Sequence, residues 1–239
     1  STNFRHLTGD ALAVSIRHHI ELKDINYVQI HPTTFYSEKP EDRSFLISES
    51  VRGEGAKLYD KNMERFVNEL LPRDLLTEAI YAQMEKDHTK FVWEDLRTIP
   101  EEELRSHFPN IVEHCEKMGY DVTKECIPVV PAQHYFMGGI KVNHRSRTSM
   151  EQLYAVGETA CNGVHGRNRL ASNSLLESLV FAKRAAKDMA LNYPLVKKNP
   201  DVFQSVDLND YANQELLEES YRKQVLQEMK KADEKTKTA

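Results

Sequence analysis

Apolar stretches of two different lengths alternate along the chain, and this alternation limits the possible folds more than any other feature. Short runs such as residues 27–30 have the length of a β-strand. Longer stretches repeat their apolar residues at helical spacing, as residues 74–84 do with Leu75, Ala79 and Ile80 on one side. No apolar run approaches the roughly 20 residues that a membrane span needs. The pattern predicts a globular fold that mixes helices and strands.

The same patterns predict further elements toward the C-terminus. Residues 138–142 and 153–156 are expected to be paired strands. Two prolines hold residues 127–131 extended, because proline restricts the residue before it. Residues 173–191 are expected to form a well-packed helix, since three leucines at its start precede a series of alanines. A polar helix is expected from Asp207 onward.

Charge and cysteine content exclude several classes of function. The formal net charge of -5 argues against nucleic acid or an anionic membrane as the main partner, because both require a basic face. Cys115, Cys126 and Cys161 form an odd set without C-x-x-C spacing, so neither a disulfide framework nor a zinc site is indicated. The first six residues lack the apolar core of a signal peptide. We therefore expect a cytoplasmic protein without a bound metal.

Polar clusters stand at the predicted ends of several strands and helices. They cover residues 31–33, 52–55, 72–74, 134–139 and 163–174. Loops at such ends can converge on a ligand. Arg73 and Arg169 can each grip a carboxylate with two parallel hydrogen bonds, and His31 and His134 can each donate one. A dicarboxylate fits this set of donors.

Each of these residues also has a simpler interpretation when it is taken singly. A lone loop arginine is more often a surface charge or part of a structural ion pair, and a lone histidine is more often structural. Gly53 and Gly55 are interpreted as turn glycines, because no G-x-G-x-x-G motif follows a strand here.

The clusters taken together resemble the succinate dehydrogenase and fumarate reductase flavoprotein superfamily in their residues, order and spacing. Within that superfamily, Pro-Arg-Asp at 72–74 and Leu-Ala-Ser-Asn-Ser-Leu-Leu-Glu at 170–177 are similar to the L-aspartate oxidase family. The respiratory enzymes usually have Leu-Gly-Gly/Ala-Asn-Ser-Leu-Leu in the second motif. The resemblance covers about residues 5–190.

The resemblance implies a role for several of the residues in substrate chemistry. Arg73 matches the family's catalytic arginine, which donates or accepts a proton beside the carbon that exchanges a hydride with the flavin. This role is unusual for a side chain that is normally always charged. Matching the positions that hold the substrate carboxylates are His31, Ser48, His134, Arg169 and Ser172. Ser48 stands where a threonine is commoner, and the hydroxyl is kept.

A second group of residues is implied to contact the flavin nucleotide. The matching positions are Asp10, Glu158, Ser174 and Leu175. Ser174 opens a helix whose N-terminus would stabilise the anionic reduced flavin. Two simpler interpretations stay open: Asp10 as a helix N-cap, and residues 172–174 as a plain capping sequence. Arg167 departs from the family, which usually has a small residue there, and could aid dicarboxylate capture or face solvent.

The resemblance also implies the domain organisation. The expected fold is α+β, with an α+β capping domain inserted in an incomplete doubly wound FAD-binding domain and followed by a C-terminal helical tail. Expected boundaries are 1–24 and 136–190 for the FAD-binding segments, 25–135 for the capping domain and 191–239 for the tail. The glycine-rich turn that binds the flavin pyrophosphate is not in the sequence. We therefore expect the chain to be a fragment that is inactive and lacks bound FAD when isolated.

The activity implied for the parent protein is FAD-dependent oxidation of L-aspartate to iminoaspartate, a step of de novo NAD biosynthesis. FAD would be bound non-covalently, electrons would pass to oxygen or fumarate, and quinolinate synthase would take the product. A soluble fumarate reductase or succinate dehydrogenase flavoprotein, acting on fumarate or succinate, is the alternative within the superfamily. A non-catalytic dicarboxylate-binding module is the alternative from another class.

Overall fold

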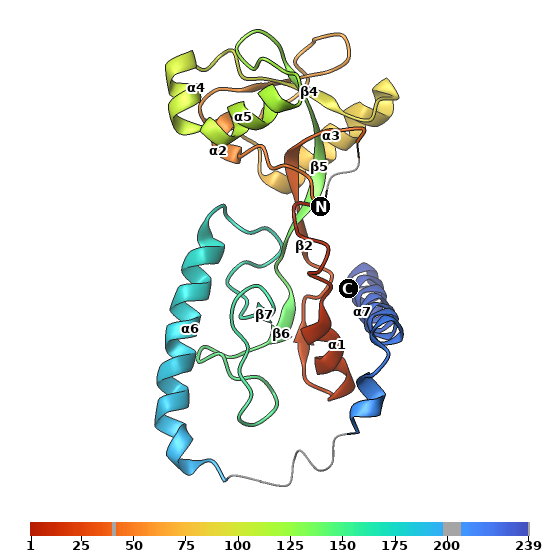
Figure 1. Ribbon diagram of the computed structural model, residues 1–239, viewed down its shortest axis with the longest axis vertical. Helices are drawn as coiled ribbons and strands as arrows, with labels where there is room; N and C mark the ends of the chain where they lie inside the picture. Colours follow the sequence, from red (N-terminus) through yellow and green to blue (C-terminus); the bar gives the residue numbers. More distant parts are fainter. Residues whose placement is uncertain (40–41, 198–206, 239) are drawn as a thin grey trace. The chain divides into compact units, whose positions relative to one another are not determined.

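The computed structural model describes residues 1–39, 42–197 and 207–238. The chain divides into two compact units, which are described separately (Figure 1). Unit 1 comprises residues 1–5 and 29–134, and unit 2 comprises residues 6–28 and 135–239. The expected capping domain, residues 25–135, has similar bounds to unit 1, and its identity as a capping domain stays a prediction. Part of the expected tail, residues 198–206, lies outside the described residues.

Unit 1 is built on a four-stranded sheet with the order β2-β5-β4-β3. Its strands are β2 (Val28–Phe35), β3 (Lys57–Tyr59), β4 (Val92–Asp95) and β5 (Ile127–Phe136). β4 pairs antiparallel with both β3 and β5. The strand predicted at 27–30 and the extended segment at 127–131 are confirmed, and both run further than their apolar patterns indicated.

Four helices complete unit 1, and a single apolar core joins them to the sheet. They are α2 (Glu49–Gly53), α3 (Arg73–Asp87), α4 (Glu101–His107) and α5 (Pro109–Lys117). Fully buried side chains come from helices and strands alike, among them Leu58, Leu76, Ile80 and Leu104. Unit 1 therefore buries its apolar residues with its own elements.

The helix predicted over residues 74–84 is confirmed as α3; Ile80 on its predicted face is buried, but Leu75 on the same predicted face is not. Leu76, Thr77 and Ile80 are buried, whereas Leu75 is exposed. Apolar residues stand at 75, 76, 79 and 80, so their spacing alone does not decide which side of the helix meets the sheet. Packing against the sheet selects the side that carries Leu76 and Ile80.

Unit 2 contains a small sheet with the order β1-β6-β7. β6 (Gly139–Lys141) pairs antiparallel with β1 (Leu22–Lys23) and parallel with β7 (Ala160–Cys161). A Cβ atom on Gly138 would lie 2.0 Å from the backbone oxygen of Asp24, and one on Gly139 would lie 2.3 Å from that of Thr159. Glycine is therefore required at both positions for the strands to approach so closely.

The strand predicted at residues 153–156 is wrong. This segment forms only an isolated bridge between Tyr154 and Arg147, and β6 pairs with β1 and β7 instead. The actual partners are two-residue strands, which are too short to produce an alternating apolar pattern.

The helices of unit 2 lie on either side of this sheet in Figure 1, with α6 on one side and α1 with α7 on the other. Their bounds are Asp10–Arg17 for α1, Asn173–Asn192 for α6 and Gln214–Thr238 for α7; short 3-10 helices span Tyr193–Leu195 and Leu208–Tyr211. The predicted polar C-terminal helix is confirmed as α7. It packs on α1, where Arg17 donates a hydrogen bond to Ser220 at 2.7 Å and lies over the Tyr221 ring.

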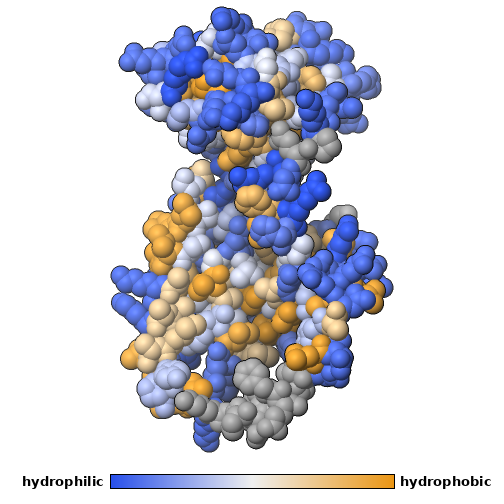
Figure 2. Space-filling view, in the orientation of Figure 1, coloured by the Kyte–Doolittle hydropathy of each residue, from blue (hydrophilic) through white to orange (hydrophobic). Residues whose placement is uncertain are grey.

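The helix predicted at residues 173–191 is confirmed as α6, but it is not well packed by the described residues. Leu175 and Leu179 have exposed fractions of 74% and 72%, and Leu176 is also exposed. In Figure 2, hydrophobic residues gather over this helix. No helix in the described part of the chain has the length and apolar character to cross a membrane.

Candidate functional site

Arg73 is the centre of a group of polar side chains in unit 1, which we call the unit 1 cluster: Gln29, His31, Glu49, Arg73 and His134. Ser48 precedes Glu49 in the chain. Arg73 is the first residue of α3 and follows the N-cap Pro72. Its side chain is only 9% exposed. Arg73 Nε donates to the Glu49 carboxylate at 2.5 Å, and Nη1 donates to the Gln29 side-chain oxygen at 3.0 Å. The guanidinium is thus fixed in a buried position by two acceptors.

Glu49 connects this buried arginine to solvent. It lies in the first turn of α2, directly after the N-cap Ser48, whose hydroxyl accepts from the backbone N–H of Ser50. The Glu49 side chain is 44% exposed while Arg73 beside it is buried. A charge-assisted hydrogen bond of this kind is short and strong, and it holds the two side chains together.

His31 is held in the neutral form, and its hydrogen bond fixes which nitrogen carries the proton. Its Nε2 lies 2.8 Å from the carbonyl oxygen of Ile47, which can only accept, so Nε2 donates. Nδ1 is then an acceptor, and it is buried without a partner among the described residues. Burial, followed by the charge of Arg52, lowers the pKa of His31 well below its usual value.

The hydrogen bond of His31 to Ile47 limits how His31 could bind a substrate carboxylate. To donate to a substrate carboxylate, Nε2–H must leave the Ile47 carbonyl, because Nδ1 carries no hydrogen in this state. The ring of His134, from β5, stands edge-on to His31 with 5.2 Å between centroids. His134 Nδ1 lies 2.9 Å from the Thr2 hydroxyl. The structure brings the two histidines together, and their carboxylate contacts stay predictions.

Sequence reasoning missed two members of the unit 1 cluster. Gln29, His31 and Thr33 share one face of β2, because alternate residues of a strand point the same way, and all three are buried. Gln29 could have been found from His31 by this alternation. Glu49 could have been found from its place beside Ser48 at a helix start. Neither had a motif that marked it as functional.

Arg169 is the centre of a second group in unit 2, the unit 2 cluster: Tyr135, His165, Arg169 and Ser174. The Arg169 guanidinium lies 4.3 Å from the centre of the Tyr135 ring, and its Nη1 donates to the Ser174 hydroxyl at 3.4 Å. His165 stands edge-on to the same ring, with 5.6 Å between centroids. Burial raises the pKa of Tyr135 to about 12, so the ring stays neutral beside the cation.

The start of α6 has the features of a site for an electron-rich group. Its N-cap, Ser172, has a left-handed backbone with φ of 66°, and no side chain caps the helix. Ser174 and Leu175 lie in the first turn. Uncapped N–H groups and the positive end of the helix dipole attract anionic ligands. The interpretation of residues 172–174 as a capping sequence is right in that Ser172 is the N-cap, but its side chain makes no capping hydrogen bond.

Glu158 lies near this cluster, because its charge adds to burial in raising the pKa of Tyr135. The Glu158 carboxylate accepts from the backbone N–H of Phe136 at 2.8 Å. Asp10 lies in the first turn of α1, where the N-cap is Gly9, and its carboxylate accepts from the Thr8 hydroxyl at 2.6 Å. Its alternative role as an N-cap is wrong. Arg167 is exposed and lies 5.3 Å from the centre of the Tyr27 ring.

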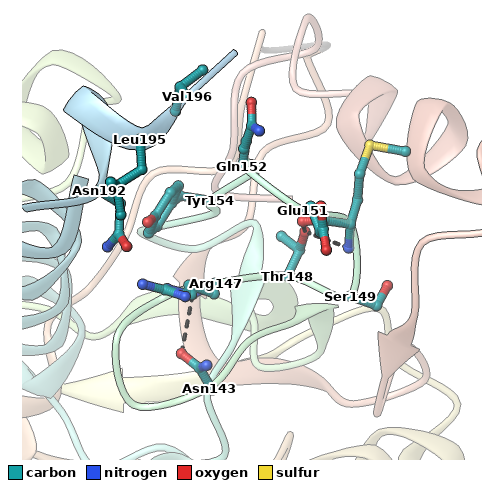
Figure 3. A pocket seen from close by; sticks show the side chains of 11 residues that line it. Asn143, Arg147, Thr148, Ser149, Glu151, Gln152, Tyr154, Asn192, Leu195 and Val196 are labelled. Carbon is teal, nitrogen blue, oxygen red and sulfur yellow. Dashed lines mark hydrogen bonds between the residues drawn. The ribbon is translucent and has the colours of Figure 1, made fainter.

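A cavity of about 370 Å³ in unit 2 contains none of the predicted site residues (Figure 3). Its lining includes Asn143, Arg147 and Tyr154. Arg147 donates to the Asp188 carboxylate at 2.5 Å, and the Tyr154 hydroxyl donates to the same group at 2.7 Å. The charge of the cavity's arginine is therefore already compensated, and we assign the cavity no ligand.

Comparison with known proteins shows the family of this chain. A family model described as FAD binding domain matches residues 1–175. The chain belongs to this FAD binding domain family. It is 58% identical over 189 residues to an L-aspartate oxidase of Clostridium perfringens and 52% identical over 199 residues to one of Clostridium acetobutylicum. These matches cover 79% and 83% of this chain but 43% and 46% of the relatives, so the chain spans less than half of their length.

A solved structure of the family supports the fold. A variant of E. coli quinol fumarate reductase matches with a TM-score of 0.75 and 31% identity, over 85% of this chain and 38% of that one. The mixed helix and strand content therefore matches a flavoprotein of the predicted superfamily. The uncapped start of α6 and the hydroxyl and carboxylate groups of Ser174, Glu158 and Asp10 suit parts of FAD, the cofactor named by the family.

Proposed function

We propose that the protein that contains this chain oxidises L-aspartate to iminoaspartate with FAD as cofactor. The observation that carries the proposal is the buried Arg73, fixed by Glu49 and Gln29 beside the neutral His31. The similarity to two clostridial L-aspartate oxidases, each above 50% identity, supports aspartate as the substrate. The proposed reaction forms a C=N bond as the substrate loses a hydride from Cα and a proton from its amine.

Each cluster by itself contains a buried arginine that suits a carboxylate group of the substrate. Arg73 and Arg169 are buried, so their attraction to a carboxylate is screened less than that of surface arginines. His134 and the Ser48 and Ser172 hydroxyls would add hydrogen bonds. The N–H group of the histidine and the serine hydroxyls would fix the orientation of a substrate carboxylate, while the arginines would supply positive charge.

Proton movement is assigned to the pair formed by Arg73 and Glu49. The half-exposed Glu49 would take a proton from the Arg73 guanidinium and pass it to solvent, and the neutral Arg73 would then accept the proton of the reacting substrate. His31 remains neutral and would not compete for this proton near pH 7. When bound, FAD supplies the hydride-accepting chemistry.

The flavin contacts are assigned to unit 2. The uncapped start of α6, with Ser174 and Leu175, would face an electron-rich part of the cofactor and favour its anionic reduced form. Glu158 and Asp10 would accept hydrogen bonds from hydroxyl groups. In this assignment residues 25–135 are the capping domain, and residues 1–24 and 136–190 belong to the FAD-binding domain.

The remaining proposals concern the cellular setting. Oxygen or fumarate would reoxidise the cofactor in the cytoplasm, and quinolinate synthase would consume iminoaspartate in de novo NAD biosynthesis. A fumarate reductase or succinate dehydrogenase activity is the second candidate, because the similar solved structure is a quinol fumarate reductase. A non-catalytic dicarboxylate-binding module is the third.

Substrate assays on the product of the complete gene, loaded with FAD, separate these candidates. The proposal predicts ammonia release from L-aspartate, since iminoaspartate hydrolyses, and little dye-linked oxidation of succinate. The opposite preference would favour the second candidate. Binding of both dicarboxylates without any turnover would favour the third.

A further inference from the structure

Glu94 is the most unusual charged residue of unit 1. It lies on β4 between Leu58 of β3 and Ile127 of β5, and its exposed fraction is 0%. Neither carboxyl oxygen has a hydrogen-bond partner among the described residues. Buried carboxyl groups are normally paired, because an unpaired one loses its hydration without compensation. A residue of this kind requires an explanation beyond packing.

Arg52 is a buried cation in the same unit. It lies on α2 and is 2% exposed. Its Nε donates to the backbone carbonyl of Glu69 at 3.3 Å, and its Nη1 donates to the Thr33 hydroxyl. No carboxylate of the described residues lies within ion-pair distance of Arg52. Burial lowers its pKa, and the charge of Glu94 opposes that shift more strongly than the charge of Glu49 or Glu69 does.

The backbone brings Glu94 and Arg52 into one neighbourhood. Glu94 pairs with Leu58 across the sheet, and the Leu58 N–H donates to the Glu69 carboxylate at 3.0 Å. The carbonyl of the same Glu69 accepts from Arg52. Both residues therefore adjoin Glu69 in the same core, and the charge of Glu94 acts on Arg52 more strongly than that of Glu49 or Glu69.

Arg52 in turn holds the elements that carry the unit 1 cluster. Thr33, which it contacts, donates to the Ile47 carbonyl at 3.1 Å, and His31 donates to the same oxygen at 2.8 Å. Ile47 precedes Ser48 and Glu49 directly in the chain. If the charge around Arg52 changes, the effect can pass to His31, because Thr33 and His31 donate to the same Ile47 carbonyl. It can also pass to the Glu49–Arg73 pair, because Arg52 and Glu49 belong to the same helix, α2.

We propose that Glu94 is a positioning residue of the unit 1 cluster, which acts through Arg52 by gaining and losing a proton. When Glu94 is ionised, it compensates the buried charge of Arg52. When it is protonated, the cluster carries one more uncompensated positive charge and binds a dianionic substrate more tightly. This inference rests on the proposed function, because it takes a dicarboxylate as the ligand.

The pH at which this change occurs follows from the surroundings of Glu94. Burial raises its pKa to about 7, against the charge of Arg52 and in the same direction as the charge of Glu69. The third neighbouring group is Cys115 on α5, whose pKa is raised to about 12 by burial, so its thiol stays neutral. Arg52 remains charged. Glu94 is therefore the group of this core that changes its charge near neutral pH.

The test compares Glu94→Gln with the control Glu113→Gln, which removes an exposed carboxyl from α5. Both are measured in the FAD-loaded product of the complete gene, as the KM for aspartate between pH 5.5 and 8.5. A single buried charge near the ligand changes affinity on the order of tenfold. Wild type and control should show this rise in KM as pH passes 7, and Glu94→Gln should lack it. An equal pH dependence of KM in all three would overturn the proposal.

A second measurement does not depend on activity. In the unmodified 239-residue chain, a carbon-13 NMR titration of the glutamate carboxyl groups should show Glu94 changing near pH 7, with the Arg52 Nε–H signal shifting over the same range. Titration of Glu94 near pH 4 to 5, or an Arg52 signal that does not follow it, would reject the inference. If aspartate is not oxidised at all while this coupled titration is seen, the proposed function fails and the link between Glu94 and Arg52 stands.

Discussion

The two units of the chain bury their apolar residues to very different degrees. Unit 1 has a core that joins the sheet to α2, α3, α4 and α5. The cluster of buried apolar residues in unit 2 consists of Leu12, Ile20, Ile140 and Ala155, with a few partly buried neighbours. The helix α6 of unit 2 leaves Leu175, Leu176, Leu179 and Leu191 exposed.

This difference shows that an apolar pattern indicates a buried face without indicating what covers it. Burying one leucine side chain contributes about 1.5–3 kcal/mol, so a helix with several exposed leucines has a large unused capacity for packing. The chain spans less than half of the length of its clostridial relatives. Unit 1 should behave as a folded body, and unit 2 should depend on further contacts.

The largest expected effect is on the free energy of unfolding, which should respond to a change in the core of unit 1 but not to one on the exposed surface of α6. Leu58→Ala in unit 1 should lower the free energy of unfolding by about 2–5 kcal/mol, because it leaves a cavity in a fully buried site. Leu179→Ala on α6 should change it by less than about 0.5 kcal/mol, since that side chain is exposed. Urea unfolding followed by tryptophan fluorescence reports on unit 1, which contains Trp93. Equal losses in the two variants would contradict the comparison.

A second prediction concerns the pH dependence of unit 1. The folded state raises the pKa of Glu94 from its usual 4.5 to about 7, so between these values the folded chain holds a proton that the unfolded chain has lost. The contribution of Glu94 to stability should therefore fall as pH rises from 4.5 to 7, by on the order of 3 kcal/mol. It is measured as the difference between the wild type and Glu94→Gln, because His31, whose pKa is lowered, contributes with the opposite sign in both chains; the difference between the wild type and Glu113→Gln should stay constant. Parallel profiles for the wild type and Glu94→Gln would contradict the burial of Glu94.

Both clusters are expected to contribute to substrate binding to a similar extent. His134→Ala in unit 1 and Arg169→Ala in unit 2 should each raise the KM for aspartate by the equivalent of about 1.5–3 kcal/mol, because each leaves a carboxylate without a charge-assisted hydrogen bond. Steady-state kinetics on the FAD-loaded product of the complete gene measures this. An unchanged KM in one variant would confine the binding role to the other unit.

The smallest effect on stability is expected at the surface of α6, where association is the more sensitive measure. The isolated 239-residue chain should be colourless and self-associate, since exposed leucines favour contacts between copies. Leu175→Lys with Leu179→Lys should reduce the apparent mass in light scattering while the unfolding free energy stays nearly constant. A monomeric wild type carrying stoichiometric FAD would show that unit 2 is complete in itself.

Patterns of apolar residues predicted the helices α3 and α6, because both carry enough turns to show a period. They failed where the strands are only two residues long, as in β1 and β7, and where apolar residues surround a helix, as around Leu75 and Leu76 in α3. Periodicity needs length and a one-sided distribution, and these segments lack one or the other.

Some residues of the candidate site could be predicted from sequence motifs, and others could be found only from their contacts in the structure. Arg73, His31 and His134 stand in motifs, and the structure places the two histidines and Arg73 in one cluster. Gln29 and Glu49 became visible only through their contacts with Arg73. Glu94 gave no signal, because its neighbour Asp95 makes the end of β4 look like a solvent-exposed turn rather than part of the core.

The central claim is that Arg73 handles the proton of an FAD-dependent aspartate oxidation, and Arg73→Ala in the FAD-loaded product of the complete gene tests it most directly. A residue that acts on the transferred proton contributes mainly in the transition state. The variant should therefore lose kcat by at least on the order of 10²-fold, the usual contribution of a proton-transferring side chain, while its dissociation constant for aspartate changes much less. A kcat equal to that of wild type would contradict the account.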